Sequence, residues 1–548
     1  MNSRLARSAG LIGVATMASR LLGIAREIVL ARMFGASATP DMDAFNVAFR
    51  IPNLVRDLFA EGAMTAAFVP TFSRTLNGKG KEAAWRLGNL VINALLLVTG
   101  VIVVLGIVFA APITRTITSA DIVGDLLRML GLAVQAPSPG GFASVPGKLE
   151  LTTELTRIMM PFLTTVAVAV AMMGMLNSLH RFFLPALSPA MFNVVTILCA
   201  VGLAPLMPAF GLPPIFGIAI GTLLGGLGQI AIQWPTLRRE GFRYRPTLNF
   251  RDPDVREILR LMGPGTLGLA AVQINVLVNT SLATTQPQGA VSWLQYAFRL
   301  MYLPIGLFGV SIATASLPDL SKHAGDSDRS AMRRTISNGL RLMLMLNVPA
   351  TIGLIVLAQP IIELLFEYRR FNAHDTVATA AALMCYSPGL LGYSAVKIAS
   401  PSFYSLRDSR TPAIVSVLSI LLNLTLNIVL VRVMGYRGLA LGTAIAALFN
   451  AGTLLFLPSR RLDGIEGRAV LVSFLKILVA SVLMGAASYY VSMWLTTQLP
   501  SHEWYWRAVR VFGAIAAGII VLAGAAHALS IEEFNDAVDR VRRRLGRR

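Results

Sequence analysis

Charged side chains stand inside two apolar segments near the start of the chain, and their types and spacing offer chemistry. The segments 8–32 and 42–72 carry nine of them: Arg20, Arg26, Glu27, Arg32, Asp43, Arg50, Arg56, Asp57 and Glu61. Arg299 and Lys397 stand in similar segments further along the chain. The arginine side chain binds phosphate oxygens through two parallel hydrogen bonds and does not lose its proton in proteins. Because cations outnumber acids in this set, the residues favour a site for a phosphate-bearing anion over a site for a cation.

The same charged residues also fit a second interpretation, an internal salt-bridge network. In that network four acids neutralise the arginines: Glu27, Asp43, Asp57 and Glu61. Arg20 and Arg26 are six residues apart, about 240° around a helix, so an ideal helix does not place them on one face. A bend near Gly23, or different depths in a broad cavity, would let both side chains converge on one ligand.

Catalytic and metal-binding arrangements are not found in the sequence. The five histidines stand singly at segment ends or in loops: His180, His323, His374, His502 and His527. No HExxH, GxSxG or Walker A motif occurs, nor a GxGxxG between a strand and a helix. Cys199 and Cys385 lie in apolar runs, and two cysteines are too few for a disulfide framework or a zinc site. We therefore expect no enzyme activity, no metal and no cofactor.

The composition indicates a membrane protein. Of 548 residues, 55% are hydrophobic and 14% are charged, with a mean hydropathy of +0.65, whereas soluble domains are about a quarter charged. A helix needs about 20 apolar residues to cross the hydrocarbon. The pattern predicts an all-α polytopic membrane protein with fourteen spans, near 8–32, 42–72, 86–111, 153–178, 184–205, 213–236, 256–284, 289–317, 334–358, 376–404, 412–431, 438–458, 470–496 and 506–529.

The distribution of basic residues orients these spans. With the N-terminus in the cytoplasm, the cytoplasmic segments hold 28 Lys and Arg residues and the outer segments hold 8. This difference follows the positive-inside rule, so we expect both termini in the cytoplasm. Most of the net charge of +20 is then a signal of topology. The C-terminal VRRRLGRR is interpreted as an anchor to lipid headgroups, and no nucleic-acid partner is expected.

Two pairs of similar sequences predict a parallel duplication. The stretch AFRIPNLVRDLF from Ala48 resembles AFRLMYLPIGLF from Ala297 at an offset of 249. The stretch from Ser178 resembles the one from Ser405 at an offset of 227. The offsets differ by 22, so extra residues are expected between positions 74 and 178, where the Pro/Gly/Ser-rich VQAPSPGGFASVPGKLE occurs. Parallel repeats around a central cavity are a transporter architecture.

The duplication predicts how the chain is divided. The expected parts are a six-helix N-terminal lobe at 1–240, a six-helix C-terminal lobe at 241–465, two extra helices at 466–530 and a basic cytoplasmic tail at 531–548.

Several stretches of this sequence resemble one known family. SRLLGIAREIVLARMFG from Ser19 and DAFNVAFRIPNLVRDLFAEGAMTAAFVP from Asp43 are similar to the signature of the MurJ (MviN) family. WLQYAFRLMYLPIGLFGVSIATASLP from Trp293 and VKIASPSFYSLRDSRTP from Val396 also match. The family comprises lipid II flippases of the multidrug/oligosaccharidyl-lipid/polysaccharide exporter superfamily, and the resemblance covers essentially the whole chain. It implies fourteen spans arranged as six, six and two, the last two forming a groove for the lipid tail.

The resemblance also implies roles for individual residues. The cavity residues that bind pyrophosphate would be Arg20, Arg26 and Arg299, joined by Arg56, Asn53 and Lys397. The residues near the outward gate and the upper cavity would be Asp43, Arg50 and Glu61.

The sequence departs from the family pattern in two places. Phe298 stands where many members have an acid, and Tyr302 stands at a position that is often polar. Some members bind sodium through carboxylates, whereas the corresponding residues here are neutral and would make at most a weak cation site: Asn279, Asn423, Asn427 and Thr443. The sequence therefore argues against sodium coupling. It leaves the membrane potential or an ion gradient as the driving force.

The function that the resemblance implies is translocation of lipid II, the undecaprenyl-pyrophosphate-linked peptidoglycan precursor. The protein would move it from the cytoplasmic to the outer leaflet of the bacterial inner membrane by alternating access. The expected partners are lipid II, the lipid bilayer and cell-wall synthesis enzymes. Two alternatives remain: a flippase for another polyprenyl-pyrophosphate-linked glycan of the O-antigen type, and a non-transporting membrane scaffold for cell-wall enzymes.

Overall fold

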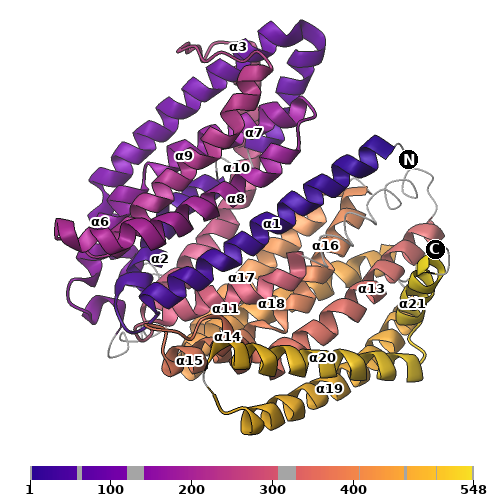
Figure 1. The fold of residues 1–548 in the computed structure, drawn as a ribbon. Coiled ribbons are helices and arrows are strands. Elements are labelled where there is room, and N and C mark those ends of the chain that lie inside the picture. Colours follow the sequence, from indigo (N-terminus) through magenta and orange to yellow (C-terminus); the bar gives the residue numbers. More distant parts are fainter. Residues whose placement is uncertain are drawn as a thin grey trace. The chain divides into compact units, whose positions relative to one another are not determined.

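The computed structural model describes residues 3–58, 64–119, 141–306, 329–405, 408–461, 466–501 and 503–545 (Figure 1). Within these ranges the regular structure is helical, as predicted, and one isolated β-bridge joins Tyr368 and Phe371. The first half contains α1 (Ser3–Phe34), α2 (Asp41–Arg56), α3 (Met64–Val108), α4 (Ala110–Thr118), α6 (Lys148–Met159), α7 (Phe162–Ser178), α8 (Phe183–Leu198), α9 (Ile215–Arg239) and α10 (Pro253–Thr284). The second half contains α11 (Ala290–Pro304), α13 (Arg329–Val356), α14 (Ala358–Leu365), α15 (Ala373–Tyr386), α16 (Gly389–Ser405), α17 (Arg410–Met434), α18 (Tyr436–Arg461), α19 (Gly467–Gln498), α20 (Trp504–Ala528) and α21 (Glu532–Leu545).

The chain forms two compact units. The first contains Met1–Ser292 and the short segment Tyr368–Phe371, and the second contains Trp293–Glu367 and Asn372–Arg548. The boundary falls in the first turn of α11. The helix α10, which the sequence assigns to the second lobe, packs on α3 and α4 in the first unit. The predicted lobe limits at 240 and 241 stay a prediction from the repeat.

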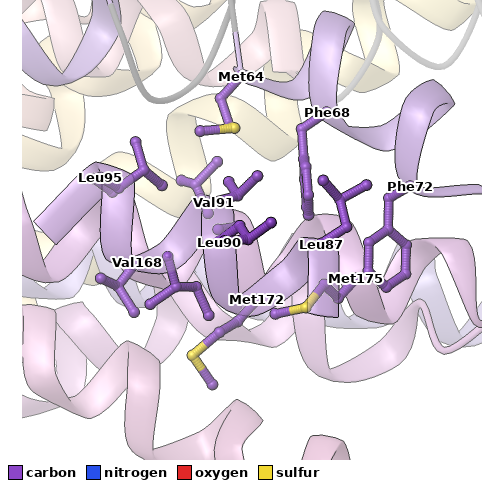
Figure 2. Packing of buried hydrophobic residues seen from close by; sticks show 14 of the residues in the cluster. Met64, Phe68, Phe72, Leu87, Leu90, Val91, Leu95, Val168, Met172 and Met175 are labelled. Atoms are coloured by element: carbon purple, nitrogen blue, oxygen red, sulfur yellow. The ribbon is translucent and has the colours of Figure 1, made fainter. Parts of the chain in front are cut away.

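The core of the first unit lies where α3 packs on α7. Figure 2 shows the buried side chains of this cluster: Met64, Phe68, Phe72, Leu87, Leu90, Val91, Leu95, Val168, Met172 and Met175. Because lipid is as apolar as this interior, close packing contributes more to the cluster than removal from water does. The helix α3 is broken at Gly80, whose φ of 84° belongs to the left-handed region. The break separates the second predicted span from the third.

Polar side chains on α3 hold the segment that connects α9 to α10. The Asn89 amide donates to the carbonyl oxygen of Arg243 at 2.9 Å and accepts from the Arg245 N–H at 2.9 Å. Past the end of α9, Glu240 forms ion pairs with Arg181 at 2.9 Å and with Lys81 at 3.4 Å. The hydrogen bond from Arg181 is the main cause that lowers the pKa of the Glu240 carboxyl below its ordinary value. These contacts hold the beginning of the connecting segment against α3 and against the segment between α7 and α8.

The second unit combines a helical core with the two extra helices. The helix α18 packs on α16 and α17, while α13 packs on α19, which lies along α20. Arg507 of α20 forms ion pairs at 3.2 Å with Glu363 and at 3.1 Å with Glu367 at the end of α14. Arg341 of α13 pairs with Glu532 at 2.5 Å, at the start of α21. Ion pairs therefore bind α20 near its start, and α21 at its start, to other helices of this unit.

The helices confirm the predicted duplication in register. The helix α2 begins at Asp41 and α11 begins at Ala290, an offset of 249, and the starts of α4 and α14 give an offset of 248. From α6 onward the offset is 227, as the ends of α6 and α15 and the starts of α8 and α17 show. The helices α7 and α16 have this same offset and contain 17 residues each. The extra residues therefore lie between α4 and α6, inside the predicted interval.

Nine helical stretches in the described part of the chain are long and apolar enough to cross a membrane. The helices α2, α11 and α16 are not among them, because they contain only 16, 15 and 17 residues. The predicted spans coincide with helices wherever the structure describes them, but the number fourteen stays a prediction.

The packing of α16 on α18 in the second unit depends on Gly392 of α16. A Cβ atom at this position would lie 2.5 Å from the carbonyl carbon of Ala447 on α18. We expect Gly392→Ala to destabilise the protein by about 1–3 kcal/mol, because backbone atoms cannot move aside. The measurement is the apparent Tm of the purified protein in detergent. Gly452→Ala on α18 is the control, since nothing lies within 4 Å of its added methyl group. An equal Tm for both variants would contradict the close approach.

Candidate functional site

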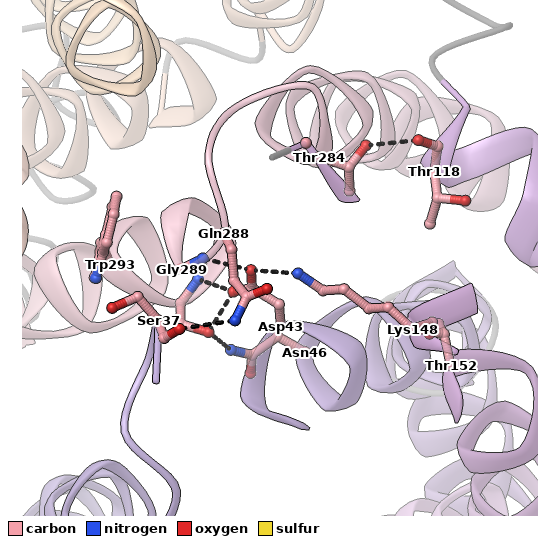
Figure 3. A network of polar contacts seen from close by, with 12 residues as sticks. Ser37, Asp43, Asn46, Thr118, Lys148, Thr152, Thr284, Gln288, Gly289 and Trp293 are labelled. Atoms are coloured by element: carbon pink, nitrogen blue, oxygen red, sulfur yellow. Dashed lines mark hydrogen bonds and ion pairs between the residues drawn. The ribbon is translucent and has the colours of Figure 1, made fainter. Parts of the chain in front are cut away.

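A buried carboxylate, Asp43, is the centre of a polar network in the first unit (Figure 3). Asp43 lies in the first turn of α2 with 2% of its side chain exposed. Its Oδ1 accepts hydrogen bonds from the N–H and the hydroxyl of Ser292, at 3.0 and 2.6 Å, and its Oδ2 accepts from the N–H of Gly289 at 2.8 Å. These donors stand at the start of α11, where the partial positive charge of a helix N-terminus stabilises an anion.

The fourth partner of Asp43 is Lys148, the first residue of α6. Its Nζ lies 3.0 Å from Oδ2 of Asp43, and its side chain is 0% exposed. The same ammonium stands 4.3 Å from the centroid of the Phe142 ring. A cation at a helix N-terminus is disfavoured by the helix dipole, so Lys148 depends on Asp43 as much as Asp43 depends on it. The pair is fully desolvated and polarised by the neighbouring ring.

Further hydrogen bonds in the first unit surround this ion pair. Asn46 donates to the Ser292 hydroxyl at 3.1 Å, and Gln288 donates to the carbonyl oxygen of Ser37 at 2.7 Å. The hydroxyl of Thr284 donates to the carbonyl oxygen of Thr118 at 3.4 Å. Figure 3 shows how these side chains from α2, α4, α10 and the start of α11 lie around Asp43. Polar contacts thus join α2 to the start of α11, and a separate hydrogen bond joins the ends of α4 and α10.

The second unit has a related contact at the equivalent position. Asp375 of α15 is the counterpart of Lys148 at the repeat offset of 227. It is fully buried, and its Oδ1 accepts a hydrogen bond of 2.9 Å from Nε1 of Trp293 on α11. Each repeat therefore joins the same two helix starts through a buried charged residue, which is a lysine in one repeat and an aspartate in the other.

The predicted cavity arginines of α1 lie on one continuous helix. The helix runs from Ser3 to Phe34 without a break at Gly23. Arg26 is buried, with Nη2 2.6 Å from Oε1 of Glu27 and Cζ 5.3 Å from the centroid of the Phe192 ring on α8. Arg20 is half-buried one and a half turns earlier. On this helix, Arg20 and Arg26 would contact one ligand at different depths of a cavity.

The candidate residues at the end of α2 form a second group. Nη2 of Arg56 lies 2.7 Å from Oδ1 of Asp57, whose other oxygen accepts a hydrogen bond of 3.3 Å from Gln273 of α10. Asn53 and Arg50 are half-buried on the same helix. Glu61, the third predicted gate residue, lies outside the described residues. The salt-bridge interpretation is thus supported for Glu27 and Asp57, each of which pairs with the arginine directly before it, while Asp43 pairs with Lys148.

The candidate cations of the second unit are both exposed. Arg299 lies on α11, and Lys397 lies on α16. The aromatic rings of these two helices touch one another: the Tyr302 and Tyr393 ring centroids are 6.4 Å apart. The structure therefore brings the two helices together beside the predicted cations.

The residues proposed as a weak cation site fall into both units. In the second unit, the Asn427 amide donates to Oδ1 of Asn423 at 3.2 Å, and the Asn423 amide donates to the Thr443 hydroxyl at 3.4 Å. Asn279 belongs to α10 of the first unit. Three of the four residues thus form a hydrogen-bonded chain, and cation binding stays a prediction.

Lys148 is the site residue that the sequence analysis did not find. The charge pattern places it among the cations of an outer loop, in a segment whose acids look solvated. The sequence feature that points to Lys148 is its position directly after Gly147, near the start of a span. Nothing in the sequence states which acid would reach it 105 residues away.

The fold of this chain is shared with solved membrane transporters. A solved structure of a multidrug resistance MATE family transporter of the MOP superfamily, in the inward-facing conformation, superposes with a TM-score of 0.62 and 17% identity. It covers 84% of this chain and 99% of its own. A structure of the lipid II flippase MurJ in an inward closed conformation gives a TM-score of 0.72 and 27% identity, over 95% of this chain and 99% of its own.

The sequence comparisons identify the family. The family model described as lipid II flippase MurJ matches residues 30–509. A probable lipid II flippase MurJ of Vibrio cholerae is 35% identical over 83% of each chain, and the lipid II flippase MurJ of Burkholderia cenocepacia is 34% identical over 81% of this chain and 82% of its own. A relative from Rhizobium meliloti is 33% identical over 93% of this chain and 91% of its own. The chain belongs to the MurJ family.

The ion pair of Asp43 and Lys148 can be tested by removing one charge or both. Lys148→Met leaves a buried carboxylate without its cation, a change that costs about 3–5 kcal/mol in other proteins, so the apparent Tm should fall clearly. The double variant Asp43→Asn with Lys148→Met should be more stable than Lys148→Met alone. Lys79→Met is the control, because its ion pair with Asp254 is exposed and contributes about 0–1 kcal/mol. A Tm of Lys148→Met equal to that of the control would refute the role of the pair.

Proposed function

We propose that this protein translocates lipid II from the cytoplasmic to the outer leaflet of the bacterial inner membrane, as its relatives are named to do. Membership of the family and the superposition on an inward closed flippase support this function. The observation that carries it is the presence of arginines in helices of a membrane protein, where charges almost always face a cavity or a partner. We further propose that the protein acts as a transporter without enzyme activity and that both termini lie in the cytoplasm.

The arginines of the first unit suit the pyrophosphate of the substrate. Arg26 keeps a planar guanidinium between Glu27 and the Phe192 ring, a setting that fixes its orientation before a ligand arrives. A phosphate group offers stronger, bidentate hydrogen bonds than a single carboxylate oxygen does. We propose that Arg20, Arg26 and Arg56 bind the pyrophosphate, and that Arg299 and Lys397 of the second unit also contact the headgroup during transport.

The membrane potential is the proposed driving force. Each negative charge that moves outward gains about 2.3 kcal/mol per 100 mV when the inside is negative. A pyrophosphate carries more than one such charge, so the substrate moves downhill without a coupled ion. The neutral side chains of Asn423, Asn427 and Thr443 support a mechanism without sodium. In a proteoliposome assay of labelled lipid II, translocation should persist without sodium and increase when an inside-negative potential is imposed.

The proposed arginines are tested by complementation of cells depleted of their own flippase. Arg26→Ala and Arg299→Ala should each fail to restore growth at normal protein levels. Arg26→Lys should also fail, because an ammonium cannot replace a bidentate fork. Arg86→Ala is the control and should restore growth, since this side chain is exposed and its carboxylate partner lies 3.9 Å away. Growth with all arginine variants would exclude the pyrophosphate role.

The same cells separate the proposed function from its alternatives. A leaflet-accessibility assay on labelled lipid II should show outward transfer with the wild-type protein and none with Arg26→Ala. A scaffold would leave the transfer unchanged while it altered cell-wall enzymes. A flippase for another glycan would rescue an O-antigen export mutant instead.

A further inference from the structure

The exposed stripe of α11 differs in composition from the exposed stripes of the apolar helices. Besides the apolar Val291, Leu303 and Pro304, its half-buried and exposed residues recur at helical spacing and carry amide, aromatic and basic groups: Gln295, Phe298, Arg299 and Tyr302. The exposed side chains of α17 are mainly aliphatic, among them Ile414, Val417, Leu418, Leu421, Val429 and Val433. A charged side chain within a membrane-spanning segment almost always faces a cavity or a partner. Arg299 therefore marks a side of α11 that is suited to a polar ligand.

Aromatic rings of α11 and α16 form a cluster on this stripe. Tyr302 is 41% exposed, and its ring stacks on Phe298 with centroids 5.8 Å apart and an interplanar angle of 28°. Behind this pair, Tyr386 and Tyr393 meet the edge of Phe298 at 5.4 and 6.3 Å. The three inner rings fix the orientation of Tyr302, so one face of an aromatic ring is held in place at the surface of the unit.

Cations stand beside the exposed ring on both helices. Arg299 is three residues before Tyr302 on α11, which places the two side chains on neighbouring positions of one face. Lys397 is four residues after Tyr393 on α16 and is also exposed. The second unit thus presents a fixed aromatic ring together with two cations.

The equivalent helix of the first unit lacks this tyrosine. At the repeat offset of 249, Phe298 and Arg299 correspond to Phe49 and Arg50 of α2, whereas Tyr302 corresponds to Asn53. The ring of Phe49 stacks instead with phenylalanines: Phe45, Phe162 and Phe192. The exposed ring is therefore not a requirement of the shared helix packing.

We propose that Tyr302, supported by Phe298 and Tyr393, is a stacking surface for the sugar next to the pyrophosphate of lipid II. This inference rests on the proposed function. A pyranose ring has an apolar face of C–H groups that packs on an aromatic ring, and polar edges that accept hydrogen bonds. Arg299 and Lys397 stand where the phosphates attached to that sugar carry their charge. In this proposal the stacking surface binds the sugar, and the two cations bind the pyrophosphate.

Two ligands that share the polyprenyl pyrophosphate, only one of which carries the sugars and their attached peptide, test this assignment. Binding of lipid II and of undecaprenyl pyrophosphate is measured for the purified full-length protein in nanodiscs. Tyr302→Leu should raise the Kd for lipid II about 3- to 10-fold and leave the Kd for undecaprenyl pyrophosphate within twofold. Tyr302→Trp keeps a ring and should bind lipid II as the wild type does. Arg299→Ala should weaken both ligands.

Controls separate this inference from the proposed function. Tyr404→Leu removes another exposed tyrosine of α16 and should change neither Kd. If Tyr302→Leu is unstable, Tyr302→Gln gives the same measurement. A wild-type protein that does not bind lipid II would refute the proposed function. The wild type could bind lipid II while Tyr302→Leu weakened the binding of both ligands equally, or of neither. Either result would overturn the stacking surface for the sugar and leave the proposed function standing.

Discussion

The burial of the Asp43 carboxylate is the constraint that organises the first unit. An ionised carboxylate out of water costs several kcal/mol unless charges and hydrogen bonds replace its hydration. Four donors do so here, and they come from the starts of α6 and α11. Each of these helix starts must therefore keep its place relative to α2. The polar contacts of Asn46 and Gln288 extend the same requirement to neighbouring loops.

Two arginines of α1 and α2 are also neutralised by nearby acids. Arg26 and Arg56 each have an acid directly after them in the sequence, at 2.6 and 2.7 Å. Because each acid is adjacent to its arginine in the sequence, these ion pairs do not depend on the position of another helix. In the proposed function, a pyrophosphate would add hydrogen bonds to a cation that is already compensated, so the ligand-free protein would not carry an unpaired charge in the membrane. The salt-bridge and ligand-binding interpretations thus describe the same residues.

The sequence predicted what depends on local pattern and missed what depends on distant partners. Spans and repeat register follow from hydropathy and similarity, and the helices begin and end at the predicted offsets. The helix α1 continues through Gly23, because one glycine lowers helix propensity without ending a helix that packs along α8. The role of Lys148 was missed, since a cation at a span end looks like any loop cation until its acid is known. The packing of α10 on α3 and α4 was not expected either, since it depends on contacts between segments far apart in the sequence.

The hydrogen bond between Asp43 and Ser292 joins two residues at the repeat offset of 249, which is also the offset between the starts of α2 and α11. A residue of one repeat therefore touches its own counterpart in the other. Two aspartates at these positions would repel each other, as paired carboxylates do. Because both repeats lie in one chain, the two positions can carry different residues. A carboxylate acceptor in one repeat therefore meets hydroxyl and N–H donors in the other.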